Sequence, residues 1–243
     1  MPNSDLIRRE SGIPARRARA LLEEFQQYEE TGTPLSQLQK AVRTARVGYN
    51  ELYRRGNDEP YFNHPARVAK NVRLAGYDEE TQAAAYLHDI IEKAGFSRTE
   101  LELLGFSETI IRLVESLSYD RRSKGVKYLD EIERALNECP EELREQHCII
   151  RLFDVGDNQD EHRFTNTNTI NAGQRIRWNT LYPLTASFLL ATLNGETGKS
   201  PNLLRFMRDP ASSCPSDLRV EFFIAREYTF PPGTTVALID RTL

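Results

Sequence analysis

The stretch "YLHDIIEKAGF" (residues 86–96) places a histidine and an aspartate side by side within an otherwise apolar helical run. Burying one charged group among apolar neighbours is costly, and burying two adjacent polar groups costs more unless something pairs with them. His88 and Asp89 therefore predict polar partners elsewhere in the chain. Glu92 follows His88 by four residues, one turn along the same helical face, where a carboxylate can hold or deprotonate a water molecule.

Two further polar insertions share this character. His64 lies in "EPYFNHP" (residues 59–65), just before a proline that favours a first helical turn. Asp154 lies in "IIRLFDVGDN" (residues 149–158), which we interpret as a buried helix rather than a strand because of its length and surroundings. Two histidines and two aspartates from different elements supply the nitrogen and oxygen ligands of a mononuclear transition-metal site. Asn158 shares the face of Asp154 and suits neutral hydrogen bonding to a ligand.

Simpler explanations exist for each residue taken alone. A core histidine satisfied by a neighbour would account for His88, and a salt bridge to Arg151 or a capping role would account for Asp154. Each is at least as good as a functional explanation for a single residue. Three polar insertions into apolar helices are hard to explain by packing, so together they predict a metal site.

The helical period of apolar residues runs through most of the chain as far as Gly195, with Thr33 as one N-cap candidate and a disturbance at Pro183. Helices are predicted over 4–10, 14–30, 35–55, 64–76, 78–95, 97–105, 107–118, 127–138, 148–158 and 172–195. Beyond them, alternation near residues 220–224 and the turn "PPG" at 231–233 predict a β-hairpin. The expected fold is mainly α: short N-terminal helices (1–34), a helical-bundle domain (35–195) and a C-terminal extension with the hairpin (196–243).

Composition narrows the function classes. The 36 acidic and 32 basic residues give a net charge of -4, so no bulk field selects nucleic acid or an anionic membrane. The N-terminal arginines are followed directly by acids, which favours a solvated face or a protein contact over DNA binding. Three cysteines without Cys-x-x-Cys spacing fit a reducing compartment. No apolar run approaches about 20 residues, and no secretory signal is evident, so we expect a cytoplasmic protein; its oligomeric state stays open.

The segments "EPYFNHP", "LHDIIE" and "IIRLFDVGDN" resemble the HD-domain phosphohydrolases. The likeness is closest to the hydrolase domain of alarmone synthetase-hydrolases and to small alarmone hydrolases, and it covers roughly residues 38–195. It implies an HD-domain helical bundle in which His64, His88, Asp89 and Asp154 hold one divalent ion, usually manganese. It also implies that Glu92 acts on the attacking water.

The resemblance further implies a nucleotide substrate. Arg55 matches a basic residue that contacts the nucleotide, with Arg54 as the alternative alignment; Asn158 matches another contact, and we group Tyr61 with them. The implied reaction is hydrolytic removal of the 3′-pyrophosphate from guanosine tetra- or pentaphosphate, an enzyme activity of the stringent response.

The sequence departs from the family at Lys93, which stands where these hydrolases carry a second acid. Three interpretations stay open: an ion pair with Asp89, a phosphate contact, or a lost activity. Arg46 stands where the family often has histidine, and Gly56 where it often has lysine. The alternatives to a (p)ppGpp hydrolase are therefore an HD phosphohydrolase of another nucleotide, such as an adenine alarmone, and a pseudoenzyme that binds a protein partner through its N-terminal helices.

Overall fold

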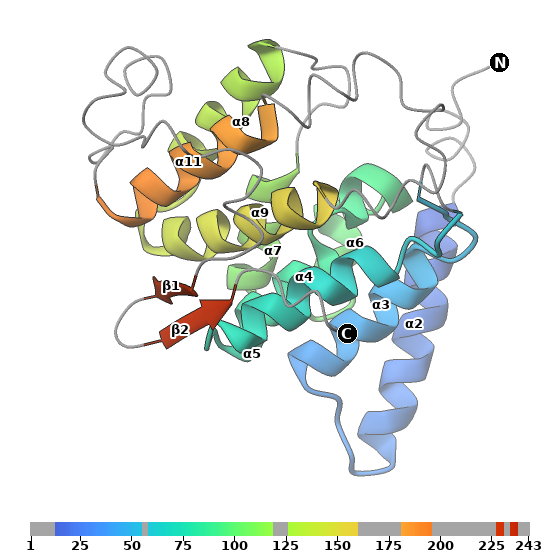
Figure 1. Cartoon of the computed structure of the whole chain (residues 1–243). Coiled ribbons are helices and arrows are strands. Elements are labelled where there is room, and N and C mark those ends of the chain that lie inside the picture. The colour runs from blue at the N-terminus through green and yellow to red at the C-terminus, as the bar shows by residue number, and fades with distance from the viewer. Residues whose placement is uncertain are drawn as a thin grey trace, which may run out of the picture.

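The computed structural model describes residues 13–54, 58–118, 126–159, 181–195, 227–230 and 234–237 of the 243-residue chain. These residues form a mainly helical structure (Figure 1). Its α-helices are α2 (Ile13–Glu30), α3 (Gln37–Gly48), α4 (Asn63–Leu74), α5 (Glu79–Leu87), α6 (Arg98–Leu103), α7 (Glu108–Leu117), α8 (Val126–Glu138), α9 (Arg144–Asn158) and α11 (Tyr182–Leu193). A π-helix, η1 (Ile90–Ala94), and a 3₁₀ turn, η2 (Glu141–Leu143), complete the helical elements.

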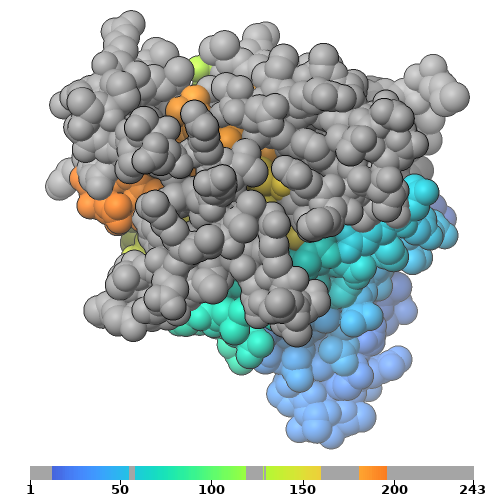
Figure 2. Space-filling model, in the orientation of Figure 1, coloured from blue at the N-terminus to red at the C-terminus, as the bar shows by residue number. Residues whose placement is uncertain are grey.

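The core is assembled around α5. Helices α3 and α4 both pack on α5, α4 also packs on α9, and α9 packs on α11 (Figure 1). Three consecutive alanines of α5, residues 83–85, are fully buried, and such small side chains allow neighbouring helices to approach closely. Helix α2 packs against α3 and α6, and α2 and α3 form the blue lobe at the lower end of the space-filling view (Figure 2).

Local sequence explains where these helices begin. Asp78 caps α5 by accepting a hydrogen bond from the backbone N–H of Thr81 at 2.9 Å. Ser36 and Gln39 form a capping box at the start of α3, so the expected N-cap at Thr33 was wrong. Pro183 lies in the first turn of α11, where proline is tolerated because its missing N–H has no intrahelical acceptor. It does not disturb α11 within the described residues, and residues 172–180 of the predicted helix lie outside them.

The predicted helix over residues 78–95 is interrupted, which corrects the sequence interpretation. Helix α5 ends at Leu87, His88 and Asp89 form a turn, and the chain continues as η1 until Gly95 in the left-handed conformation (φ +76°). Single π-turns inserted into helices often lie at functional sites. His88 and Asp89 therefore lie at the junction between an α-helix and a π-helix.

Close packing behind this junction involves Gly48, the last residue of α3. A Cβ added there would lie 2.3 Å from Cδ1 of Ile90. Ile90 opens the π-helix and is fully buried. The absence of a side chain at residue 48 thus allows η1 to pack against α3.

Two four-residue strands, β1 (Glu227–Phe230) and β2 (Thr234–Ala237), pair antiparallel with Glu227 opposite Ala237. The predicted hairpin extension over 196–243 and its packing on the helical body stay predictions, because the surrounding residues lie outside the described part. The predicted helix at 4–10 and the domain boundaries at 34 and 195 also stay predictions. Within the described residues, no helix is both long and apolar enough to cross a membrane.

Candidate metal centre

Three of the four predicted ligands converge between α4, α5 and α9. His64 lies in the first turn of α4, His88 caps the end of α5, and Asp154 belongs to α9. Each offers one donor atom, and these donor atoms all lie within 4.8 Å of one another. Nε2 of His64 is 3.1 Å from Oδ1 of Asp154, and Nε2 of His88 is 3.6 Å from the same oxygen. The two imidazole rings meet edge to face, with centroids 5.0 Å apart.

Asp89 lies beside this group. Its Oδ2 is 3.5 Å from Nε2 of His88 and 3.7 Å from Nε2 of His64, and it accepts a short hydrogen bond from the hydroxyl of Tyr61. Burial by itself would raise the pKa of Asp89, but Lys93 and the histidines lower it below its usual value. The residue therefore brings a second carboxylate to the histidines from the turn between α5 and η1.

The hydrogen bonds of both histidines suit metal binding. Nδ1 of His88 lies 2.8 Å from the carbonyl oxygen of Ala85, and Nδ1 of His64 lies 2.7 Å from a carboxylate oxygen of Asp157. Because these oxygens only accept, each Nδ1 carries the hydrogen and each Nε2 presents a lone pair, as in metal-binding histidines. Nε2 of His88 is buried and has no hydrogen-bond partner among the described residues, an arrangement that a cation would satisfy. The residues present fit a divalent ion.

The two carboxylate oxygens of Asp154 make different contacts. Its position therefore agrees both with a salt bridge to Arg151 and with a place in the candidate metal centre. Its Oδ2 accepts a hydrogen bond from Nη1 of Arg151 at 3.0 Å, the predicted salt bridge. Its Oδ1 faces the histidines and accepts a hydrogen bond from the amide of Asn158 at 2.6 Å. Burial alone would raise the pKa of Asp154, but the adjacent imidazoles of His64 and His88 hold that pKa well below its usual value. Arg151 thus fixes a carboxylate that stays ionised at neutral pH.

Glu92 and Lys93 lie on η1 and form an ion pair. Nζ of Lys93 is 2.5 Å from Oε1 of Glu92 and 3.6 Å from Oδ1 of Asp89. The ammonium also lies 5.9 Å from the ring centroid of Tyr61. The side chain of Glu92 is 6% exposed and that of Lys93 is 24% exposed. The ion pair with Asp89 was one of the three interpretations from the sequence, and the structure adds the shorter contact to Glu92.

The residues expected to bind substrate are held by internal contacts where the structure describes them. Arg54 is 5% exposed; it donates a short hydrogen bond to Asp157 and a second, at 2.7 Å, to the side-chain oxygen of Asn158. The amide of Asn158 bonds Asp154, as described above. Arg55 lies outside the described residues. Arg54 and Asn158 therefore hold Asp157 and Asp154, two carboxylates of the candidate metal centre, through hydrogen bonds.

Sequence reasoning assigned no role to Asp157. This residue accepts hydrogen bonds from His64, Arg54 and Arg67, and these contacts lower its pKa, against the effect of burial. A signal was available, because a residue three positions after Asp154 shares its helical face. The sequence alone did not predict that His64, Arg54 and Arg67 would all contact Asp157.

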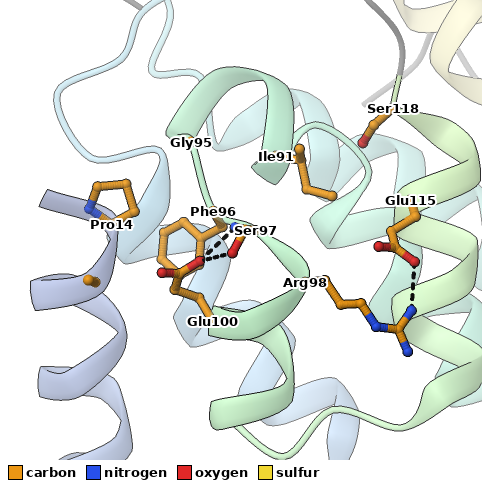
Figure 3. Close-up of a pocket in the computed structure, with 10 residues that line it drawn as sticks. Pro14, Ile91, Gly95, Phe96, Ser97, Arg98, Glu100, Glu115 and Ser118 are labelled. Carbon is orange, nitrogen blue, oxygen red and sulfur yellow. Dashed lines mark hydrogen bonds and ion pairs between the residues drawn. The ribbon is translucent and has the colours of Figure 1, made fainter. Parts of the chain in front are cut away.

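A separate pocket of about 590 Å³ opens between the start of α2, the end of η1, α6 and the end of α7. Figure 3 shows Arg98 donating to Glu115 at its rim, at 2.8 Å. The pocket shares η1 with the metal centre through Ile91, yet none of the candidate ligands lines it. The candidate chemistry thus lies apart from this pocket.

Part of the chain is similar to a known protein family. Residues 41–145 match the family described as "HD domain". That segment contains His64, His88 and Asp89, while Asp154 follows it. This segment of the chain is similar to an HD domain, and the resemblance to HD-domain alarmone hydrolases is confirmed.

Several curated proteins are similar over part of the chain. A protein of Synechocystis sp. named probable guanosine-3′,5′-bis(diphosphate) 3′-pyrophosphohydrolase is 42% identical over 65 residues, 27% of this chain and 8% of its own length. The bifunctional (p)ppGpp synthase/hydrolase SpoT of Escherichia coli is 35% identical over 101 residues, 40% of this chain and 14% of its own. The GTP pyrophosphokinase rsh of Brucella ovis is 35% identical over 105 residues. The chain therefore spans only a small part of these relatives.

A solved structure supports the fold. It is described as a metazoan ortholog of SpoT that hydrolyzes ppGpp; it aligns with a TM-score of 0.50 and 22% sequence identity, covering 73% of this chain and 96% of that chain. At this identity the likeness establishes a shared fold.

Proposed function

We propose that this protein is a metal-dependent nucleotide pyrophosphohydrolase that removes the 3′-pyrophosphate of (p)ppGpp-like alarmones. The observation that carries the proposal is the buried Nε2 of His88, which has no hydrogen-bond partner in the described part of the chain and lies near Nε2 of His64 and Oδ1 of Asp154. The HD domain and the names of the similar proteins support the substrate class. The predicted cytoplasmic location accompanies this proposal.

The proposed ligands are His64, His88, Asp89 and Asp154, with Mn²⁺ as the ion that the resemblance implies. A divalent ion bound there would polarise a phosphoryl oxygen and lower the pKa of the attacking water. The short contacts of His64 and Asp154 with their supporting residues keep these donors in place without ligand. Pre-organised donors need little rearrangement when charge develops during the reaction.

Glu92 is the proposed proton acceptor. It lies one turn after His88, its side chain is nearly buried, and the ammonium of Lys93 fixes one of its oxygens. Lys93 has a second proposed task, because a partly exposed ammonium beside the ligands attracts phosphate oxygens. Lys93 thus adds positive charge where the related hydrolases carry an acid.

The proposed substrate-binding residues are Tyr61, Arg54, Arg55 and Asn158. Tyr61 is oriented by its hydrogen bond to Asp89, which places its ring beside Lys93. Arg54 and Asn158 are bonded to each other, so a direct contact with nucleotide requires them to exchange partners. This leaves Arg55 to carry the first contact with the phosphates.

A second candidate substrate is a nucleotide with another base, such as an adenine alarmone. Arg46 replaces the family histidine, and its guanidinium lies 4.7 Å over the ring of Phe62. Phe62 in turn stacks on Tyr86 with centroids 6.1 Å apart. Arg46 therefore presents a permanently charged guanidinium, which only donates hydrogen bonds, at the position where the family often has a histidine.

A nucleotide panel tests the proposal. Purified protein with Mn²⁺ is incubated separately with guanosine and adenosine 3′-pyrophosphates and with the corresponding 5′-diphosphates, and pyrophosphate release is measured. Release from the guanosine 3′-pyrophosphate alone supports the proposal, and release from the adenosine compound supports the second candidate. No release from any nucleotide, with metal bound, favours the pseudoenzyme; gain of activity in Lys93→Asp would identify the residue responsible.

A further inference from the structure

Asp157 lies directly behind the metal centre and has no place in the proposed reaction. It is nearly buried, and its carboxylate lies between one histidine and two arginines. One oxygen, Oδ2, is 2.7 Å from Nδ1 of His64, and the same oxygen accepts the short hydrogen bond from Arg54. The other, Oδ1, accepts a short hydrogen bond from Nε of Arg67. A carboxylate in this position must present oxygens to all three neighbours.

The arginines extend this contact to the segment that precedes α4. The backbone N–H of Arg54 bonds the carbonyl of Glu59 at 2.8 Å, and Tyr53 pairs with Pro60 in an isolated β-bridge. Arg67 of α4 holds the carboxylate of Glu59 through contacts at 2.5 and 3.1 Å. The segment between α3 and α4 is therefore bound to α9 through Asp157, next to the proposed substrate-binding residues.

We infer that Asp157 is a positioning residue for the metal: its carboxylate keeps the hydrogen of His64 on Nδ1 and so leaves Nε2 free to bind the ion. The inference rests on the metal centre of the proposed function but not on its substrate. Hydrogen-bond partners of metal-bound histidines fix the tautomer and the orientation of the ring, and replacing them typically costs about 10- to 100-fold in metal affinity. The HD-domain match ends at residue 145, before Asp157.

The variant Asp157→Asn tests this with little change in volume. An amide offers one oxygen and one NH₂ group, and both arginines can only donate. One of these two groups must replace the oxygen that His64 and Arg54 share. If the amide oxygen takes that place, His64 keeps only a neutral, weaker acceptor. If the NH₂ group takes it, His64 must accept on Nδ1 and carry its hydrogen on Nε2, the atom that the metal needs.

Isothermal titration of the metal-free full chain with MnCl₂, without nucleotide, gives the readout. We expect Asp157→Asn to bind Mn²⁺ about 10- to 100-fold more weakly than the wild type. The matched control is Glu59→Gln, which removes the other carboxylate from Arg67 but does not touch His64; its affinity should equal that of the wild type. Unchanged affinity in a folded Asp157→Asn protein, or an equal loss in Glu59→Gln, would overturn the inference.

A measurement on the wild type avoids dependence on the folding of the variant. The ¹⁵N chemical shifts of the His64 ring in the metal-free protein report which nitrogen carries the hydrogen. The inference requires hydrogen on Nδ1, and hydrogen on Nε2 would overturn it. Since neither experiment contains nucleotide, a protein that binds Mn²⁺ as expected but hydrolyses no alarmone would reject the proposed function and leave the role of Asp157 standing.

Discussion

Nζ of Lys93 lies 2.5 Å from Oε1 of Glu92, the carboxylate proposed to take a proton from the attacking water. The two residues are neighbours in the chain, and both belong to the π-helix that follows the proposed ligands His88 and Asp89. The contact orders the carboxylate, and the ammonium remains partly exposed. Lys93 therefore lies beside the candidate metal centre, and we expect its replacement to change the proposed activity.

Replacing Lys93 by methionine keeps the length of the side chain but removes its charge. We expect kcat/KM for guanosine tetraphosphate to fall by about tenfold or more, because Glu92 loses its fixed orientation and the phosphates lose a cation. The free energy of unfolding should fall by about 1–3 kcal/mol, since the nearly buried carboxylate of Glu92 loses a charged partner. Lys70→Met, at an exposed position of α4, is the control. Full activity in Lys93→Met would reduce the residue to a surface ion pair.

Replacing Glu92 by glutamine removes the proposed proton acceptor and conserves its shape. The turnover number should fall by about 10²- to 10⁴-fold, the usual contribution of a general base. Mn²⁺ affinity should stay near that of the wild type, because Glu92 is not among the proposed ligands. Single-turnover kinetics and metal titration separate the two effects, with the exposed Glu138→Gln as control. A variant that loses Mn²⁺ binding instead would make Glu92 a ligand.

Gly48→Ala tests how the π-helix is positioned. The new methyl group would lie 2.3 Å from Cδ1 of Ile90, so we expect a loss of about 1–3 kcal/mol in the free energy of unfolding, typical of overpacking. Ile90→Val removes the clashing carbon and should by itself cost about 0.5–1.5 kcal/mol. The double variant should then be more stable than the sum of the two losses predicts. Strict additivity in urea unfolding would show that the contact does not constrain η1.

His147 makes stability depend on pH. It is fully buried in α9, and burial, with the nearby Arg151 and Arg144, lowers its pKa to about 3. The unfolded chain takes up the proton near its ordinary pKa of about 6.5, so the stabilisation present above that pH is lost as the pH falls toward 3. Between pH 7 and pH 5 the loss should be about 2 kcal/mol.

The His147→Gln variant isolates this contribution. His88 acts in the opposite direction in the metal-free protein, because Asp89 and Asp154 outweigh burial and raise its pKa; its stabilisation is present at low pH and is lost as the pH rises. Comparing urea unfolding of wild type and His147→Gln from pH 7 to pH 5 cancels that shared effect. Equal slopes in the two proteins would show that His147 is not buried in its neutral form.

The sequence predicted the convergence of His64, His88 and Asp154, because polar residues inside three apolar helices need common partners. It did not predict the π-helix after Asp89. The apolar period continues smoothly through residues 90–94, and the wider turn accompanies packing against Gly48, a contact between distant segments. The sequence also did not predict that the side chain of Arg54 is buried, since its position depends on Asp157 and Asn158 about one hundred residues later. The local sequence pattern thus predicted which residues converge, and contacts between distant segments determine which residues hold them in place.

The proposed hydrolase activity can be measured through the products that the full chain forms from guanosine tetraphosphate with Mn²⁺. We expect GDP and pyrophosphate in equal amounts, loss of both with a chelator, and loss of both in Asp154→Asn but not in the exposed Asp130→Asn. Absence of these products from protein that demonstrably holds Mn²⁺, or undiminished release by Asp154→Asn, would contradict it.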